Sequence, residues 1–579
     1  MFKKLLSCVR EYKLPTLLTL LFIVLEAIIE TFIPFLTANL VDNIRQKADI
    51  SHVITMGLIL VGLAVLSLAC GGIAGYTCAK ASAGFAKNLR HDMFYRIQNY
   101  SFENIDKFSS SSLVTRMTTD VTNVQMSYMM IIRIAVRAPL MLIFSIVAAY
   151  YMGGALATPF VVIIPIIVVA LVLIGKNAMP AFKRVFRKYD KLNESIEENV
   201  RGIRVVKGFA REEFEKKKFG VAASDICKDF TKAERIVVLN GPVMQFCIYL
   251  NLIFVLILGS YLIVSTGAKM IDVGEMSAML TYGFQILMNL MMLSMIYVML
   301  TMSSESLKRI GEVLDEESTL NSPQNGKKTV DDGSIIFKDV SFKYSKHAKE
   351  YALSNIDLEI KSGMTVGIIG GTGSSKSSLV QLIPRLYDVT TGSILVGGTD
   401  VKDYDLTVLR DSVAMVLQKN ILFSGTIKEN LRWGNENATD KEIIDACKCA
   451  KADEFIDTLS DGYDTYIEQG GTNVSGGQKQ RLCIARALLK HPKIIIFDDS
   501  TSAVDTKTDA KIREELKNTI PDTTKIIIAQ RISSVMDSDM IIVMDNGKIS
   551  AVGDHDKLMK TSDIYREIYE QQTGGAENE

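Results

Sequence analysis

The most informative stretch of this 579-residue chain reads Val366-Gly367-Ile368-Ile369-Gly370-Gly371-Thr372-Gly373-Ser374-Ser375-Lys376-Ser377-Ser378-Leu379-Val380. It begins with the apolar pattern of a buried strand, passes through a glycine-rich turn, and ends with the start of a helix. Backbone N–H groups and the positive end of the helix favour an anion at such a turn. The order of strand, glycine-rich loop and helix therefore predicts a phosphate-binding loop for a nucleotide.

This loop supplies a predicted site for ATP and Mg²⁺. Lys376 would reach the β- and γ-phosphates, and Ser377 would ligate Mg²⁺. Ser375 departs from the motif, because glycine is expected just before the lysine, so we expect the backbone to approach the nucleotide less closely there. The predicted ATP-binding residues of the loop are Gly370, Gly371, Thr372, Gly373, Ser374, Ser375, Lys376, Ser377 and Ser378.

A second buried strand, Lys493-Ile494-Ile495-Ile496-Phe497-Asp498, ends in a carboxylate. Asp498 is placed to hold Mg²⁺ through water, and it joins Ser377 as a predicted metal-binding residue. The eight cysteines form no pair of C-x-x-C motifs, which argues against a zinc site. We expect them to be plain structural thiols in a reducing cytosol.

Upstream of this soluble part, the chain carries long apolar runs. Apolar residues make up 48% of the whole chain, and they are concentrated between residues 14 and 305. A membrane-spanning helix needs about 20 mostly apolar residues. Six stretches meet this requirement, at residues 15–40, 53–79, 134–152, 157–175, 243–265 and 276–302.

The links after the second and fourth stretches, residues 80–133 and 176–242, are long and rich in lysine and arginine. Positive charge marks the cytoplasmic side, so we expect a multi-pass protein of the plasma membrane with both termini in the cytosol. Few glycine or proline breaks interrupt the links, which predicts helices that leave the membrane, turn near residues 103–112 and 208–214, and return. Ordinary cytosolic loops are the alternative.

A change of composition divides the chain. Residues 316–333 contain Pro323 and Gly326 and little apolar content, which indicates a linker. The sequence thus predicts an all-α transmembrane domain of six helices over residues 1–315, fused to an α/β P-loop domain over residues 334–570, with a disordered tail over residues 571–579. With 65 basic and 65 acidic residues, the charge gives no case for a nucleic-acid partner.

Between the phosphate loop and the Asp498 strand lies the segment Val474-Ser475-Gly476-Gly477-Gln478-Lys479-Gln480-Arg481. It resembles the signature motif of ATP-binding-cassette (ABC) exporters, and six spans with two long cytoplasmic links fit the same family. The resemblance implies alternating access driven by two cytosolic domains that close around two ATP molecules. In the family, the positions of Ser475, Gly476, Gly477 and Gln478 cap the ATP held by the opposite subunit.

Other family elements occur in the expected order. Tyr344 matches the aromatic residue that stacks on adenine, and Gln418 matches the glutamine that senses Mg²⁺ and contacts the membrane domain. Glu468 lies where exporters have a coupling acid just before the signature. Residues 502–505 match the loop that crosses the dimer interface.

Two catalytic positions depart from the family pattern. Active members carry glutamate directly after the Mg²⁺ aspartate and histidine in a switch position, whereas this chain has Asp499 and Gln530. A general base must lie within hydrogen-bond reach of the attacking water. Aspartate withdraws its carboxylate by roughly 1 Å, a misplacement that can cost on the order of 100-fold in rate. Glutamine cannot carry a proton as imidazole does.

The site is therefore expected to bind ATP and to hydrolyse it poorly, while the intact signature completes the site of a partner. This asymmetry resembles the degenerate half of heterodimeric exporters. A homodimer that uses Asp499 as a slow base is one alternative. An ATP-gated channel or regulatory membrane protein is another.

Ionisable and methionine side chains in the membrane domain are candidate cargo contacts. Glu26 and Glu30 lie four residues apart on one helix face. Helix packing, or a position that faces the water-filled cavity without touching cargo, is the favoured interpretation, and contact with a cationic or polar substrate is the other. Arg133 and Arg137 are expected to mark the cytoplasmic boundary of the third span. Steps of three and four place a methionine stripe on the sixth span. A plain packing face is the favoured interpretation, and contact with a small amphipathic or apolar cargo is the other. Its members include Met288, Met291, Met292, Met295, Met299 and Met302. Multidrug, lipid and peptide cargo all stay open.

Overall fold

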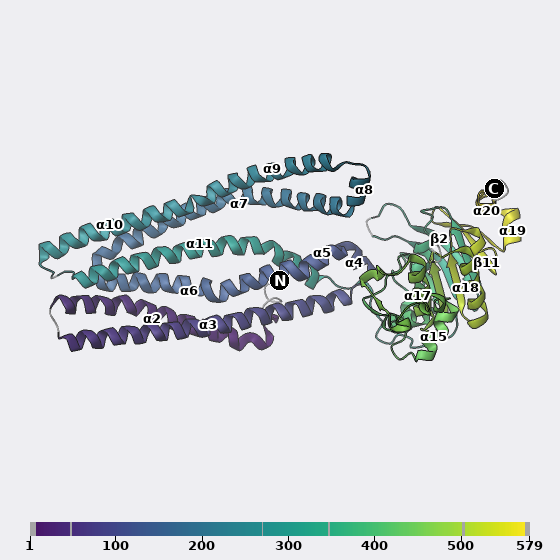
Figure 1. Ribbon diagram of the computed structural model, residues 1–579, viewed down its shortest axis with the longest axis horizontal. Helices are drawn as coiled ribbons and strands as arrows, with labels where there is room; N and C mark the ends of the chain where they lie inside the picture. Colours follow the sequence, from purple (N-terminus) through teal and green to yellow (C-terminus); the bar gives the residue numbers. More distant parts are fainter. Residues whose placement is uncertain (1–6, 47–48, 269, 346–347, 501–503, 574–579) are drawn as a thin grey trace. The chain divides into compact units, whose positions relative to one another are not determined.

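The computed structural model describes residues 7–46, 49–268, 270–345, 348–500 and 504–573 (Figure 1). By internal contacts the chain forms two compact units. One comprises Met1–Gln98 and Ser110–Glu316, and the other comprises Asn99–Ser109 and Glu317–Glu579. The short segment Asn99–Ser109 thus belongs with the C-terminal unit although the helical unit flanks it in sequence.

The first unit consists of long helices. Six of the described helical segments are long and apolar enough to cross a membrane, as the sequence predicts. The long helices of this unit are α2 (Lys13–Arg45), α3 (Ile50–Gln98), α6 (Val121–Gly153), α7 (Thr158–Arg201), α9 (Glu212–Val238), α10 (Asn240–Thr266) and α11 (Val273–Asp315).

The two long links are helical, and the alternative of ordinary loops is wrong. Helix α3 continues to Gln98 and α7 continues to Arg201, well beyond the predicted apolar stretches. Short helices occupy the turns: α4 (Phe102–Phe108) and α5 (Ser110–Thr115) in the first, and α8 (Ile203–Gly208) in the second. Ser101 begins α4 with a capping box, in which its hydroxyl accepts a hydrogen bond from the Asn104 N–H.

Within the helical unit, α2 packs against α3, α6 and α11, and α6 also runs along α11 (Figure 1). Helix α7 pairs with α9 and α10. The core between them holds large side chains such as Tyr282, whose hydroxyl donates to the Thr31 carbonyl over 2.7 Å. Large apolar side chains also face outward along these helices, for example Leu68, which is 75% exposed. Such faces suit a lipid surrounding.

The second unit contains a six-stranded sheet in the order β12-β11-β3-β10-β9-β6. Five of its strands are parallel, and β12 is antiparallel to β11. Strands β3 and β9 flank β10, with Ile368 and Asp498 both opposite Ile528. The carboxyl ends of these strands therefore meet at one edge, where open α/β sheets bind their ligands. The bounds are β3 Thr365–Gly370, β6 Val413–Val416, β9 Ile494–Asp498, β10 Thr524–Ile528, β11 Met540–Asp545 and β12 Lys548–Gly553.

Two smaller sheets complete the unit, in the orders β2-β1-β4-β5 and β7-β8. Their strands are β1 Ile335–Phe342, β2 Leu353–Ile360, β4 Thr391–Val396, β5 Thr399–Asp400, β7 Gly425–Thr426 and β8 Tyr466–Ile467. The helices are α12 Lys376–Gln381, α13 Leu406–Ser412, α14 Ile427–Arg432, α15 Asp440–Cys449, α16 Asp453–Ile456, α17 Gly476–Leu488, α18 Thr506–Thr519, α19 His555–Thr561 and α20 Asp563–Thr573. The cysteines of this unit are buried and free, and burial raises the pKa of the Cys447 thiol to about 12.

Candidate functional site

The glycine-rich loop connects β3 to α12 and curls around its own lysine. The Lys376 Nζ donates to the carbonyl oxygens of Gly370 and Gly371 over 2.8 and 2.9 Å. Gly370 has a φ of 153°, and a Cβ there would clash with the Met544 carbonyl oxygen on β11. Ser375 has a φ of 68°, a left-handed conformation that a side chain disfavours. The departure from glycine at this position is therefore also a point of backbone strain.

The predicted metal-binding pair is in contact. Ser377 Oγ donates to Asp498 Oδ1 over 2.7 Å, which joins the start of α12 to the end of β9. Asp498 is buried, and burial raises the pKa of its carboxyl, while burial lowers the pKa of the Lys376 ammonium.

A hydroxyl and a carboxylate side by side fit Mg²⁺ held together with phosphate oxygens, since that ion uses one or two carboxylates rather than a full protein cage. In line with this, the described residues contain no cluster of three or more His, Cys, Asp or Glu side chains that could hold a metal.

Asp499 lies directly beyond this pair and is held by two amides. Its Oδ2 accepts hydrogen bonds from Gln530 Nε2 over 2.8 Å and from Gln418 Nε2 over 3.3 Å. The residue is only 9% exposed, and its φ is 49°. The sequence-predicted residues of the catalytic corner therefore come together. The same oxygen that a general base would offer to water already accepts from two neutral side chains.

A residue that the sequence does not point to holds the switch segment. Gln572 of α20 donates to the Gln530 carbonyl over 2.8 Å, and its own Oε1 accepts from the Ile532 N–H over 2.8 Å. No motif marks Gln572, and it lies 42 residues from Gln530. Only the tertiary structure relates them.

Tyr344, the predicted adenine-stacking residue, belongs to an aromatic group. Its hydroxyl pairs with Ser378 Oγ over 2.8 Å, and its ring meets the Tyr387 ring edge-on at 5.2 Å between centroids. The Tyr387 hydroxyl donates to Asp106 of α4 over 2.8 Å. Burial and the neighbouring Asp106 raise the pKa of Tyr387. Tyr344, the predicted contact to adenine, is thus connected to α4 through Tyr387, which the sequence analysis did not single out.

The signature segment occupies a different place on the same unit. Ser475 caps α17 in a reciprocal arrangement: the Gln478 N–H donates to Ser475 Oγ over 3.3 Å, and the Ser475 N–H donates to Gln478 Oε1 over 2.8 Å. Ser475 and Gly476 are exposed beside a hollow of about 420 Å³. That hollow is lined by Ser475, Gly476, Gly477, Arg481, Val504 and Asp505, and by no described residue of the loop 370–377.

Two further family positions are placed as follows. Glu468 Oε2 accepts a hydrogen bond from Thr472 Oγ1 over 2.6 Å, just ahead of the signature segment. Of the predicted interface loop, Asp505 caps α18, while Ser502 and Ala503 lie outside the described residues.

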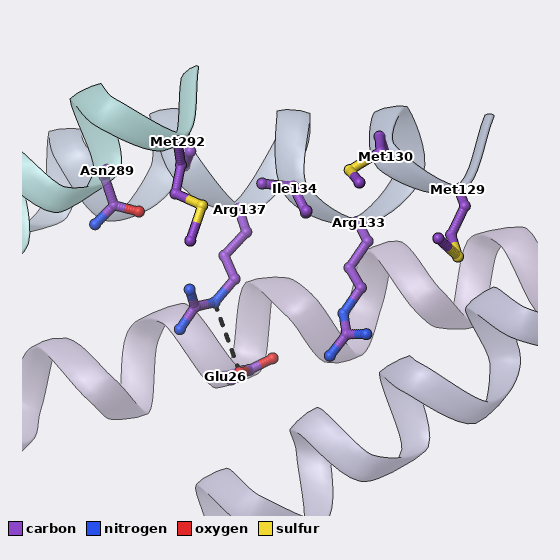
Figure 2. Close-up of a pocket in the computed structure, with 9 residues that line it drawn as sticks. Glu26, Met129, Met130, Arg133, Ile134, Arg137, Asn289 and Met292 are labelled. Atoms are coloured by element: carbon purple, nitrogen blue, oxygen red, sulfur yellow. Dashed lines mark ion pairs between the residues drawn. The ribbon is translucent and has the colours of Figure 1, made fainter. Parts of the chain in front are cut away.

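In the helical unit, the acidic pair of α2 is joined to α6. Arg137 Nη2 lies 2.5 Å from Glu30 Oε2, and Arg137 Nε lies 3.6 Å from Glu26 Oε1. Figure 2 shows Arg133 and Arg137 projecting from α6 on the same side, toward the helix that carries Glu26. Both arginines line a cavity of about 350 Å³. They thus line a cavity of the helical unit rather than only marking the end of a span.

The methionine side chains of the α11 stripe do not all face the same environment. Met292 lines the same cavity, beside the buried Asn289 (Figure 2). Met288 and Met299 are partly buried, and Met295 is 65% exposed. The side chain of Met302 lies outside the described part of the chain.

Comparison with known proteins places these features in a common context. The model for the ABC transporter transmembrane region matches residues 16–295, and the ABC transporter model matches residues 353–502. The chain is 37% identical to the ABC transporter ATP-binding protein YfiB of Bacillus subtilis (strain 168), over 99% of both chains. It is 35% identical to the ABC transporter ATP-binding protein Rv1273c of Mycobacterium tuberculosis, over 97% of this chain and 96% of the relative. Its fold matches the structure of a bacterial Atm1-family ABC exporter with ATP bound, with a TM-score of 0.83, 24% identity and coverage of 97% and 98%.

Proposed function

Because the chain belongs to the ABC transporter family, as an exporter-type half-transporter with a transmembrane and an ATP-binding domain, we propose that it works as the degenerate half of a heterodimer. In this role its own site holds Mg²⁺·ATP and hydrolyses it slowly. Its signature segment completes the active site of a second exporter half. The cargo is a small amphipathic or apolar molecule moved across the plasma membrane, with both termini in the cytosol.

The observation that carries the proposal is the double hydrogen bond to Asp499. Gln530 and Gln418 both donate to Asp499 Oδ2. A base must accept a proton from an attacking water, and a short carboxylate already engaged by two amides is poorly placed for that. The Gln530 amide can hydrogen-bond phosphate but cannot exchange a proton as imidazole does.

The binding part of the same site is complete. Lys376 and the loop N–H groups would hold the phosphates, Ser377 and Asp498 would hold Mg²⁺, and Tyr344 would stack on the base. When bound, Mg²⁺ would neutralise phosphate charge.

The proposal keeps the transmembrane domain at residues 1–315 and the linker at residues 316–333. The ATP-binding domain begins at residue 334 and extends past the predicted end at residue 570, because α20 continues to Thr573 and Gln572 holds the Gln530 segment. Residues 571–573 are therefore helical and not part of a disordered tail.

The signature segment supports the second part of the proposal. Ser475 and Gly476 are exposed at the N-terminus of α17, where backbone N–H groups favour a phosphate. Their hollow does not include the described loop residues of the same chain. An ATP capped by Ser475 would therefore be held mainly by another subunit.

Two variants of the full-length chain, purified together with its partner half, test the proposal. We expect Ser475→Arg to abolish ATP turnover, because a bulky cation would fill the place of the partner's γ-phosphate. Asp499→Asn should change turnover by less than about twofold, because the slow site contributes little. The opposite pattern would reject the assignment.

A matched control distinguishes the loss of the contact to the partner's ATP from the loss of a helix cap. Thr439 begins α15 with the same kind of capping box, formed with Glu442. Thr439→Arg should cost about 1 kcal/mol of stability and leave turnover intact. Equal losses in Thr439→Arg and Ser475→Arg would indicate damage to the fold instead.

Two other functions remain testable against this one. A homodimer with slow hydrolysis at Asp499 predicts a complex of two identical chains by mass, active without any co-expressed half. An ATP-gated channel predicts passive current instead of cargo accumulation in sealed vesicles.

A further inference from the structure

The cavity of the helical unit is lined by a guanidinium, that of Arg133, for which the described residues provide no ion-pair partner. Arg133 projects from α6 and lines the cavity of about 350 Å³ (Figure 2). Within the described part of the chain, no hydrogen bond or ion pair to its guanidinium is found. The guanidinium lies beside Gly75 of α3, where a Cβ added to the backbone would be 3.8 Å from its nitrogens.

The carboxylates that the sequence suggests for a cationic cargo are already engaged. Glu30 and Glu26 both face Arg137, at 2.5 and 3.6 Å. Glu26 is also confined on its other side by Gly71 of α3, whose hypothetical Cβ would be 3.2 Å from Glu26 Oε1. These two acids thus form a packed ion-pair group with Arg137, and a cationic cargo would have to displace Arg137 to reach them.

The charges that face the cavity therefore favour an anion. Glu26, Arg133 and Arg137 line it, whereas Glu30 does not. A guanidinium with open donors offers a fork of N–H groups that matches the oxygens of a carboxylate or a phosphate. Arg133 is exposed in the helical unit and lies within a segment apolar enough to cross a membrane, and an ionisable residue within such a segment is a functional candidate.

The remaining walls are apolar and adaptable. Met129 and Met130 of α6 and Met292 of α11 line the cavity beside the guanidinium groups (Figure 2). Methionine side chains are flexible and polarisable, and they accommodate chains of different shape. The positive charge of Arg133 would bind an anionic head group, and the methionines around it would contact an apolar body.

We propose that Arg133 and the methionines around it bind the head and the adjoining chain of an anionic amphiphile, a carboxylate or phosphate on a hydrocarbon body. This assignment rests on the proposed transport function and specifies its cargo class. The shared chemistry comes from two sources, an anionic membrane lipid or a free amphipathic acid. The test separates them.

The test measures binding to the full-length complex in phosphatidylcholine nanodiscs without nucleotide. Two probes of equal chain length, a dansyl fatty acid and a dansyl alkylamine, report the preferred charge. We expect tighter binding of the acid. Arg133→Gln should weaken acid binding about tenfold, the loss of a charge-assisted hydrogen bond, and leave amine binding unchanged. Arg133→Lys keeps the charge but lacks the fork, so it should retain part of the acid binding.

Arg235→Gln on the exposed face of α9 is the matched control, because it removes the same charge away from the cavity. A fluorescent phosphatidylglycerol, compared with its phosphatidylcholine analogue, tests the lipid source. A response of this lipid alone to Arg133→Gln would assign the cargo to membrane lipid, and a response of the fatty acid would assign it to free amphiphiles.

Tighter binding of the amine, or equal acid binding by wild type and Arg133→Gln with no lipid response, would overturn the proposal. Because no hydrolysis is needed, this failure is distinct from a failure of the unequal-site proposal. That proposal concerns only Ser475 and Asp499.

Discussion

The signature segment and the catalytic corner are two parts of one domain that we propose to face nucleotides, and they differ in how well their residues match the family pattern. At Ser475 the residue types match the family pattern and the local hydrogen bonds form a reciprocal cap. At Asp499 and Gln530 both residue types differ, and the two side chains bond to each other. Under the proposed assignment, the signature segment and the catalytic corner serve different ATP molecules, so the residues of one can change without those of the other.

The largest expected effect is on the rate of ATP hydrolysis, when the family residues are restored at the catalytic corner. In a complex whose partner half carries glutamine in place of its own general base, Asp499→Glu together with Gln530→His should raise residual phosphate release by about 100-fold. This is the factor that roughly 1 Å of misplacement can cost. The assay is steady-state phosphate release. Asp499→Glu alone, which leaves the Gln530 amide in place, is the control and should gain less. An unchanged rate in the double variant would mean that other groups limit this site.

A smaller effect is expected when ATP binding at the same site is weakened. Lys376→Ala removes a charge-assisted contact to phosphate and should lower ATP affinity at this site by about tenfold or more. Nucleotide binding to the complex with the partner's lysine also replaced would report it. Lys338→Ala, at an exposed position of β1, removes the same charge outside the loop. Loss of affinity in both variants would contradict the role of Lys376.

The smallest expected effect is on stability, when serine is replaced by glycine in the phosphate-binding loop or in the signature segment. Ser375→Gly relieves a left-handed residue and should stabilise the ATP-binding domain by up to about 1 kcal/mol. Ser475→Gly removes a capping hydroxyl from a residue with a φ of −68°, and it should cost a few tenths of a kcal/mol. Thermal unfolding of the purified complex should therefore shift in opposite directions. Shifts of the same sign would show that backbone strain at Ser375 is not what separates the two serines.

The sequence alone predicted those features that depend on a local pattern of residues. The run of apolar residues predicted the six spans, because length and composition alone define a membrane helix. The strand, loop and helix around Lys376 followed from glycine spacing. Ser377 and Asp498 were each predicted to bind Mg²⁺, and the structure brings them into contact because β3 and β9 end at the same edge of the sheet.

What the sequence could not supply depends on packing between distant segments. Arg137 reads as a span boundary until α6 lies against α2, where it meets Glu26 and Glu30. Gln572 and Tyr387 belong to no motif, so only the tertiary structure brings them to Gln530 and Asp106. Side-chain partners of this kind have no periodic signal.

The eleven-residue segment Asn99–Ser109 has a practical consequence for anyone who studies the ATP-binding part in isolation. Within its unit, Asp106 accepts from Tyr387, Phe102 meets the Tyr387 ring, and Ser101 pairs with Thr319. A polypeptide cut before Glu317 would lack these partners and expose an aromatic surface, which favours self-association. A synthetic peptide of residues 99–109, supplied in trans, would then act as a missing piece of the domain and not as a foreign ligand.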